Sequence, residues 1–213
     1  MTNVGYTPLY RLDAIERIQA AEKSSEIAYR SGAVLPKDYG ITGSTFRAYQ
    51  KCDQSPSSIF RSWADTSGFK LVVAASVKSR TDFLQLHQKL ASSFDLQWQG
   101  SGNRSLSIAE KYKVTDLFVK ALAFKSEHPC ESSRQALYQY ANIPLDKFSL
   151  LAVKKFFYGI VISGNPSMGD IRDYETYDFL QTQIYSLTQM AKIPNLVFDH
   201  YAWDLKNRLE PNT

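Results

Sequence analysis

Two lysines on one predicted helix are the first residues whose types and spacing suggest chemistry. Lys113 and Lys120 are seven residues apart in an apolar stretch. This spacing is about two turns of an α-helix and places both side chains on the same side. A lysine amine at the edge of an apolar face loses hydration, which favours its neutral, nucleophilic form, and such an amine can attack C1′ of a sugar or a carbonyl carbon. The structural alternative is a surface lysine whose stem covers apolar side chains while its ammonium stays in water.

Asp146 lies where a turn meets a predicted helix. It follows Ile143-Pro144-Leu145, and an aspartate just before a helix is a common N-cap worth about 1 kcal/mol. The helix dipole and the first backbone N–H groups favour the charged carboxylate. A carboxylate that also faces a cleft would stabilise a sugar cation as it develops. Capping and catalysis are therefore compatible roles for this residue.

Near the C-terminus, an aspartate and a tryptophan share one face of a predicted helix. Asp199 and Trp203 are four residues apart, a spacing that makes them neighbours on a helix surface. An indole ring can stack on a planar base, and a carboxylate can accept hydrogen bonds from the N–H groups of that base. The pair therefore predicts a base-binding pocket. The structural alternative is that Asp199 only caps the helix and Trp203 only fills the core.

The elements that must position these residues are mostly helices, because apolar residues recur at helical spacing through much of the chain. The predicted helices cover residues 11–30, 81–94, 108–124, 132–140, 148–158, 174–191 and 199–208, with short helical pieces near 45–51 and 57–63. The apolar run Phe69–Val77 fits a buried strand or a buried helix, and periodicity does not decide between them. Residues 99–107 read as a loop. We expect a mainly α, two-subdomain chain, with a cleft between subdomain 1–100 and subdomain 101–213.

Composition excludes several classes of protein. The chain has 213 residues, of which 44% are hydrophobic and 22% charged, and this balance excludes a disordered or collagen-like chain. With only Cys52 and Cys130, a disulfide scaffold is excluded and a cytoplasmic, intracellular location fits. The sequence has no apolar stretch near the ~18 residues of a membrane span. It also lacks a signal-peptide pattern at its start, so we expect no membrane partner.

Charge and missing motifs narrow the chemistry further. The net charge is +4, and the window 104–155, with nine basic and five acidic residues, accounts for all of it. This charge suits a DNA backbone, although chance clustering on a solvated face would look the same. The histidines are scattered and the two cysteines are far apart, so we expect no metal site. The sequence has no phosphate-binding Gly-rich loop and no Gly-x-Ser-x-Gly nucleophile turn, and we expect no cofactor.

Taken in order, these segments resemble the archaeal-type 8-oxoguanine DNA glycosylases, a branch of the helix-hairpin-helix glycosylase superfamily. The resemblance covers residues 101–207. It rests on Gly102-Asn103-Arg104, on the pair Lys113 and Lys120, on Pro144-Leu145-Asp146, and on Ile193-Pro194-Asn195-Leu196 with Asp199 and Trp203. Leu145 stands where the family has a valine, and Asn195 stands where it has a second proline. The residues with which the family's N-terminal half reads the base have no assigned counterpart here.

The resemblance implies a helical, bifunctional enzyme: a DNA glycosylase with AP lyase activity that works on double-stranded DNA as a monomer. It would flip out a damaged or modified base, 8-oxoguanine first among them. Lys113 would form a Schiff base at C1′, and Asp146 would stabilise the sugar cation. The base would be bound by Asp199, Trp203, Phe118 and Leu117. Contacts with the DNA backbone would come from Arg104, Lys111, Lys120 and Lys147.

Three alternatives stay open from the sequence. The chain could be a helical DNA-binding relative that kept the fold and lost the chemistry. It could be a glycosylase for another modified base. It could also be a helical interaction protein in which all of these residues are caps and core. The first alternative would bind DNA in a salt-dependent way without nicking it after alkali treatment.

Overall fold

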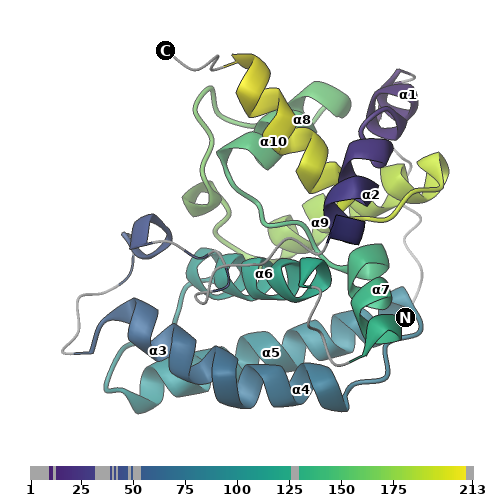
Figure 1. Ribbon diagram of the computed structural model, residues 1–213. Coiled ribbons are helices and arrows are strands. Elements are labelled where there is room, and N and C mark those ends of the chain that lie inside the picture. Colours follow the sequence, from purple (N-terminus) through teal and green to yellow (C-terminus); the bar gives the residue numbers. More distant parts are fainter. Residues whose placement is uncertain are drawn as a thin grey trace, which may run out of the picture.

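The computed structural model describes Tyr10, Arg11 and residues 13–31, 39, 41, 43–47, 49, 54–125 and 130–209. Within these residues the chain is mainly helical (Figure 1), so the predicted mainly α class is confirmed. The β-type pairing found there is an isolated bridge between Tyr10 and Phe157. No helix in this described part is long and apolar enough to cross a membrane.

Helix α6 (Ile108–Phe124) lies at the centre of the fold (Figure 1). The helices that pack together on one side of it are α3 (Pro56–Trp63), α4 (Phe69–Ala74) and α5 (Arg80–Gly100). The helices on its other side are α1 (Ala14–Gln19), α2 (Glu22–Ser31), α8 (Lys147–Phe156), α9 (Tyr174–Ala191) and α10 (Val197–Leu209). Helix α7 (Glu131–Tyr140) packs beside α6. Because α1 packs on α9 and α2 packs on α6 and α10, the two N-terminal helices lie with the C-terminal ones.

Local signals set the start of α6, whereas packing sets the length of α5. Ser107 accepts a hydrogen bond from the N–H of Glu110, and the Glu110 carboxylate accepts one from the N–H of Ser107. This capping box starts the helix where the sequence predicts it. Helix α5 extends beyond the predicted end at Phe94. The reason is that Trp98, one turn later, is also fully buried and extends the apolar face of the helix.

The apolar run Phe69–Val77, which the sequence leaves undecided, is helical as far as Ala74, and the backbone is extended at Ala75. Helix α3 continues through a π-helical turn, η2 (Ala64–Gly68), into α4. A Cβ added at Gly68 would lie 3.1 Å from the Trp63 ring and 3.2 Å from the Phe118 ring, closer than side chains normally pack. The absence of a side chain at Gly68 therefore lets this helix approach α6 closely.

Aromatic side chains fill the core between α3, α5 and α6. The ring of Phe118 is fully buried, with its centroid 5.2 Å from Tyr39, 6.3 Å from Phe60 and 4.8 Å from Trp63. The indole N–H of Trp63 donates to the hydroxyl of Ser93 at 3.1 Å. Buried aromatic rings at these separations stabilise a core through edge and offset contacts as well as through burial.

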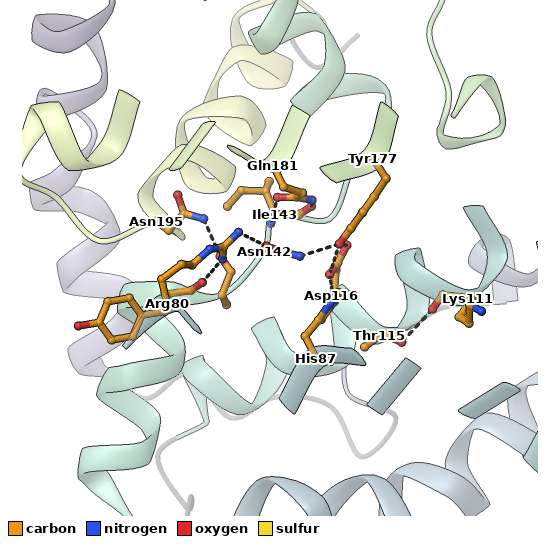
Figure 2. Close-up of polar contacts among 12 residues, drawn as sticks. Arg80, His87, Lys111, Thr115, Asp116, Asn142, Ile143, Tyr177, Gln181 and Asn195 are labelled. Carbon is orange, nitrogen blue, oxygen red and sulfur yellow. Dashed lines mark hydrogen bonds and ion pairs between the residues drawn. The ribbon is translucent and has the colours of Figure 1, made fainter. Parts of the chain in front are cut away.

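An extended segment, residues 141–146, crosses the interior between α7 and α8 and is buried along most of its length. Backbone groups in such a segment have no helical partners, so side chains must satisfy them. Gln181 does so twice, because its Oε1 accepts from the Ile143 N–H (2.9 Å) and its Nε2 donates to the Ile143 carbonyl (2.8 Å). The Asn195 Nδ2 donates to the Ala141 carbonyl at 2.6 Å (Figure 2). We call these two side chains the amide clamp, and they determine where Asp146 emerges.

A second buried polar network ties the extended segment to α5, α6 and α9. His87 Nε2 lies 2.7 Å from Asp116 Oδ1, and the Tyr177 hydroxyl donates to both Asp116 oxygens at 2.9 Å. Asn142 links the two networks: its Nδ2 donates to the Tyr177 oxygen at 2.9 Å and its Oδ1 accepts from Arg80 (Figure 2). Burial raises the pKa of Asp116, and the hydrogen bonds from His87 and Tyr177 oppose that rise.

Replacement of Gln181 by alanine should destabilise the fold strongly. The change leaves the N–H and the carbonyl of Ile143 buried without partners, at about 1–3 kcal/mol each, so urea denaturation should show a loss of about 2–5 kcal/mol. Gln189→Ala, at an exposed position of the same helix, is the matched control and should change stability by less than about 0.5 kcal/mol. A Gln181→Ala protein as stable as this control would contradict the role of the clamp.

Candidate functional site

Asp146 caps α8 and keeps one oxygen outside the cap. Its Oδ1 accepts hydrogen bonds from the backbone N–H groups of Phe148 (2.8 Å) and Ser149 (2.9 Å), and its own N–H donates to the Ser149 hydroxyl (2.7 Å). The side chain is half-buried, and its Oδ2 makes no hydrogen bond to a described residue. The carboxylate can therefore hold the helix start with one oxygen and present the other to a second group.

Lys120, Asp199 and Trp203 form one compact group between α6 and α10. The Lys120 Nζ lies 2.5 Å from Asp199 Oδ2 and 5.8 Å from the centroid of the Trp203 ring. Trp203 is 40% exposed, and its ring packs on Phe148 with a centroid distance of 5.7 Å. The structure thus brings together three residues that the sequence singled out. It adds Phe148, which sequence reasoning missed although it follows the capping aspartate closely.

Asp199 has an unusual electrostatic environment. Burial raises its pKa, the ion pair with Lys120 lowers it, and the nearby Asp146 carboxylate raises it again, so that the net direction is upward. The Oδ1 atom of Asp199 is buried and has no hydrogen-bond donor among the described residues. Buried acceptors without a donor are rare in folded proteins and call for an explanation. Here the unsatisfied acceptor belongs to the same cluster as a partly exposed aromatic ring.

Lys113 lies about two turns earlier on α6 and lines a cavity of about 500 Å³. Its side chain is half-buried and has no hydrogen-bond or ion-pair partner among the described residues. Asp146 does not line this cavity. It lies instead toward the Lys120 end of α6, close enough to Asp199 to influence its ionisation. Lys113 and Asp146, which the sequence predicts to act together, therefore lie apart. Lys113 lines the cavity near the start of α6, and Asp146 lies toward Lys120.

The two base-contacting residues expected on α6 lie in different environments. Leu117 is partly buried, and its position in the sequence places it between Lys113 and Lys120 on the same side of the helix. Phe118 points into the core, where it is fully buried against Phe60 and other aromatic rings. In this structure Phe118 has no open face on which a base could stack.

The basic residues expected to contact the DNA backbone differ in their distance from neighbouring carboxylates. Arg104 makes a two-pronged ion pair with Glu110, at 2.9 and 2.8 Å, although its side chain is still 51% exposed. Lys111 lies 3.6 Å from Asp95. Lys147 is exposed at the start of α8, with its Nζ 5.6 Å from the Phe148 ring.

Sequence reasoning also missed the role of the segment before α9: residues 163–170, rich in Gly, Pro and Asn, predict a loop, and no function was assigned to Arg172 just after it. Met168 and Ile171 are buried, and Arg172 lines the same cavity as Lys113. The available signal was the spacing of Ser167 and Asp170, which form a capping box at the short helix η3 (Met168–Asp170). Such a box indicates a fixed turn rather than an irregular loop.

A larger cavity lies away from these residues. A cavity of about 970 Å³ lies along α4 and α5, with Lys70, Leu71, Lys89 and Leu96 in its wall, and none of the residues singled out by the sequence lines it. No three His, Cys, Asp or Glu side chains in the described ranges come close enough together to hold a metal ion.

Comparison with protein families, with curated proteins and with solved structures found no match.

The ionisation of Glu110 should make stability depend on pH. Burial alone would raise the pKa of Glu110, but Arg104 and the N–H and hydroxyl of Ser107 hold it below the ordinary value of 4.5. Because the folded pKa is lowered, Glu110 stabilises the fold above its unfolded pKa, and this contribution is lost as the pH falls through the folded pKa. Glu110→Gln should cost about 1–3 kcal/mol at neutral pH.

Melting temperatures measured across the acid range should show the difference between Glu110→Gln and wild type shrinking as the pH falls. Glu175→Gln, at an exposed position of α9, is the control and should stay close to wild type at every pH. A difference between Glu110→Gln and wild type that does not change with pH would contradict the stabilising role of the Glu110 charge.

Proposed function

We propose that the chain is a DNA base-excision glycosylase with AP lyase activity. It would act as a monomer on double-stranded DNA, take a damaged or modified base out of the stack and cleave its glycosidic bond through a lysine Schiff base. Among such bases we propose 8-oxoguanine as the substrate. The active site would run along α6, in a cleft between the subdomain of α3–α5 and the subdomain of α8–α10.

The observation that carries this proposal is the buried, unsatisfied Oδ1 of Asp199 in the cluster with the partly exposed ring of Trp203. A planar base stacked on Trp203 would bring an N–H edge to that acceptor. Guanine has an acceptor at N7, which a carboxylate repels, whereas 8-oxoguanine carries an N–H there. The ammonium of Lys120 beside the same carboxylate suits the additional carbonyl oxygen at C8. The pair thus matches both groups that distinguish the oxidised base.

The spacing along α6 suits a whole nucleotide. Lys113 and Lys120 are seven residues apart, which corresponds to about 10 Å along the helix axis. With the base at Trp203, the sugar would lie over Leu117 and its C1′ would come within reach of Lys113. No carboxylate of the described residues forms an ion pair with Lys113, so its side chain is not held by another residue.

The reaction would then use two of this chain's residues at the sugar. The Lys113 nitrogen would bond to C1′ while the bond from C1′ to the base breaks, and the base would leave with a proton. Opening of the sugar ring gives a Schiff base, which permits β-elimination of the 3′ phosphate. The Oδ2 of Asp146, left outside the helix cap, lies toward the Lys120 end of α6, and from there its charge would act through space on the positive charge that develops on the sugar.

The hairpin formed by α5 and α6 supports contact with the DNA backbone. Its short connection contains Gly102 with a positive φ of 81°, which favours glycine and allows the tight turn into α6. The turn presents the half-exposed Arg104 next to the positive N-terminal end of α6. Arg104, Lys111 and the exposed Lys147 would contact phosphates, and Lys120 would serve the base instead.

Borohydride trapping tests the assigned nucleophile. Wild-type protein should form a covalent adduct with a duplex containing 8-oxoguanine opposite cytosine, and also with a duplex containing an abasic site, because both pass through the Schiff base. Lys113→Gln should lower the yield of adduct at least 100-fold on both duplexes, on the order expected when a group specific to the transition state is removed. Lys125→Gln, at the end of the same helix, is the matched control and should trap like wild type.

The outcomes separate the alternatives. An adduct that persists in Lys113→Gln but disappears in Lys120→Gln would move the nucleophile to Lys120. An adduct with abasic DNA but not with 8-oxoguanine DNA would keep the enzyme class and change the base. Salt-dependent DNA binding with no adduct on either duplex would refute the enzymatic proposal and favour a non-catalytic DNA-binding relative.

Asp199→Asn separates base recognition from lysine chemistry. An amide cannot match the carboxylate as an acceptor next to Lys120, so single-turnover excision of 8-oxoguanine should fall about 10- to 100-fold. Trapping on abasic DNA, which has no base to bind, should stay within about twofold of wild type. Glu175→Gln is again the surface control. Equal losses on both duplexes would show that Asp199 supports the fold or the sugar chemistry rather than the base.

A further inference from the structure

We propose that Arg172 binds the DNA phosphate adjacent to the nucleotide on which Lys113 acts, inside the cavity that both side chains line. This inference rests on the proposed function, because that function places the sugar of the flipped nucleotide beside Lys113. Arg172 lies outside α6 and α10, the helices that carry the two lysines and the base-binding pair.

The cavity is large enough for a sugar-phosphate unit and has fixed walls. Its volume is about 500 Å³, within the range typical of small-ligand sites. The segment around η3 packs against α6 (Figure 1). Its apolar surface comes from Tyr49, Met168 and Ile171, which are all buried, and the Tyr49 hydroxyl donates to the Glu110 carbonyl.

The lining carries more positive than negative charge. Neither Lys113 nor Arg172 has a hydrogen-bond or ion-pair partner among the described residues. Glu110 also lines the cavity, but its carboxylate is already paired with both terminal nitrogens of Arg104. The guanidinium of Arg172 is therefore a positive charge without a matching anion in this lining, and a phosphate bound beside the Lys113 amine would supply that anion.

Arg172 has the chemistry and the support that a phosphate contact needs. A guanidinium offers a planar fork of donors that matches two phosphate oxygens at once. The turn before it is held by the capping box, in which the Ser167 N–H donates to Asp170 Oδ2 at 2.7 Å. The neighbouring Ile171 is buried and anchors the backbone, while Arg172 itself is exposed and free to reach a ligand.

The cavity lies along the first half of α6, and this place suits a phosphate of the bound nucleotide rather than its base. The base-sized acceptor and aromatic ring lie at the Lys120 end, about 10 Å along the helix from Lys113. A nucleotide with its base at that end and its C1′ near Lys113 has its phosphate beyond the sugar, which is where the Arg172 cavity lies.

Binding of a duplex that contains a tetrahydrofuran abasic analogue tests this assignment without any chemical step. The analogue has no aldehyde carbon, so fluorescence anisotropy over a series of salt concentrations reports binding alone. Arg172→Ala should weaken binding about tenfold and lower the slope of log K against log salt by about one, the value for one lost phosphate contact. Arg61→Ala, an exposed arginine of α3, is the matched control, and Arg172→Lys should restore most of the slope but less of the affinity.

Methylphosphonate substitution identifies the phosphate. Neutralising one of the two phosphates that flank the analogue should weaken wild-type binding about as much as Arg172→Ala does. The Arg172→Ala protein should be insensitive to that same substitution. Arg172→Ala binding with wild-type affinity and slope, or with full methylphosphonate sensitivity, would overturn the proposal.

Failure of this proposal and failure of the proposed function give different results. Wild-type binding that depends on Arg172, without a borohydride adduct on abasic DNA, refutes the lyase and supports the phosphate contact. An adduct in wild type together with Arg172→Ala binding like wild type refutes the phosphate contact alone. No binding of the analogue duplex by wild type refutes both.

Discussion

The extended segment 141–146 is the constraint on which the rest of the structure depends. A chain that crosses the interior without helical hydrogen bonds must have its backbone satisfied by side chains, because a buried N–H or carbonyl without a partner costs about 1–3 kcal/mol. Gln181 and Asn195 of the amide clamp do this from α9 and from the turn after it. Arg80 adds hydrogen bonds to the Tyr140 carbonyl, just before the segment, and to the Asn142 side chain. Their bonds fix the segment between α7 and α8, so the place where Asp146 starts α8 is set by α9 and by the turn after it.

Helix α6 connects this constraint to the candidate chemistry because its faces differ. One face is buried through Phe118 in the aromatic core, and Asp116 joins the buried network with His87 and Tyr177. Lys113 and Lys120 lie on the same side of the helix, at the two ends of one stretch. Since Asp116 and Phe118 anchor the helix against rotation, core packing sets the side of α6 on which both lysines lie, and the ion pair with Asp199 holds only Lys120.

Along this side of α6, one basic side chain has a carboxylate partner and two others have none among the described residues. At one end Lys120 is paired with Asp199, at a desolvation cost that a well-formed ion pair offsets only in part. At the other end Lys113 and Arg172 have no partners among the residues that the structure describes. Lys113 is half-buried and Arg172 is exposed, so the two side chains can reach a ligand without first breaking an ion pair. The arrangement is more easily understood if an anionic, planar ligand such as a nucleotide occupies the side between the two ends.

Local sequence signals determined the helices and their caps. Ser107 with Glu110, the aspartate at 146 and the long apolar periodicity of 108–124 and 174–191 act within a few residues, so they can be predicted from the chain alone. The same holds for the shared face of Asp199 and Trp203. Tertiary structure decided what local signals do not contain: that Phe69–Ala74 continues a helix, that Phe118 belongs to the core, and that Arg172 shares a cavity with Lys113. It also decided that Asp146 lies toward Lys120 rather than in that cavity. The physical reason is that burial, ion pairing and cavity shape depend on residues far apart in the sequence, whereas caps and periodicity depend on neighbours.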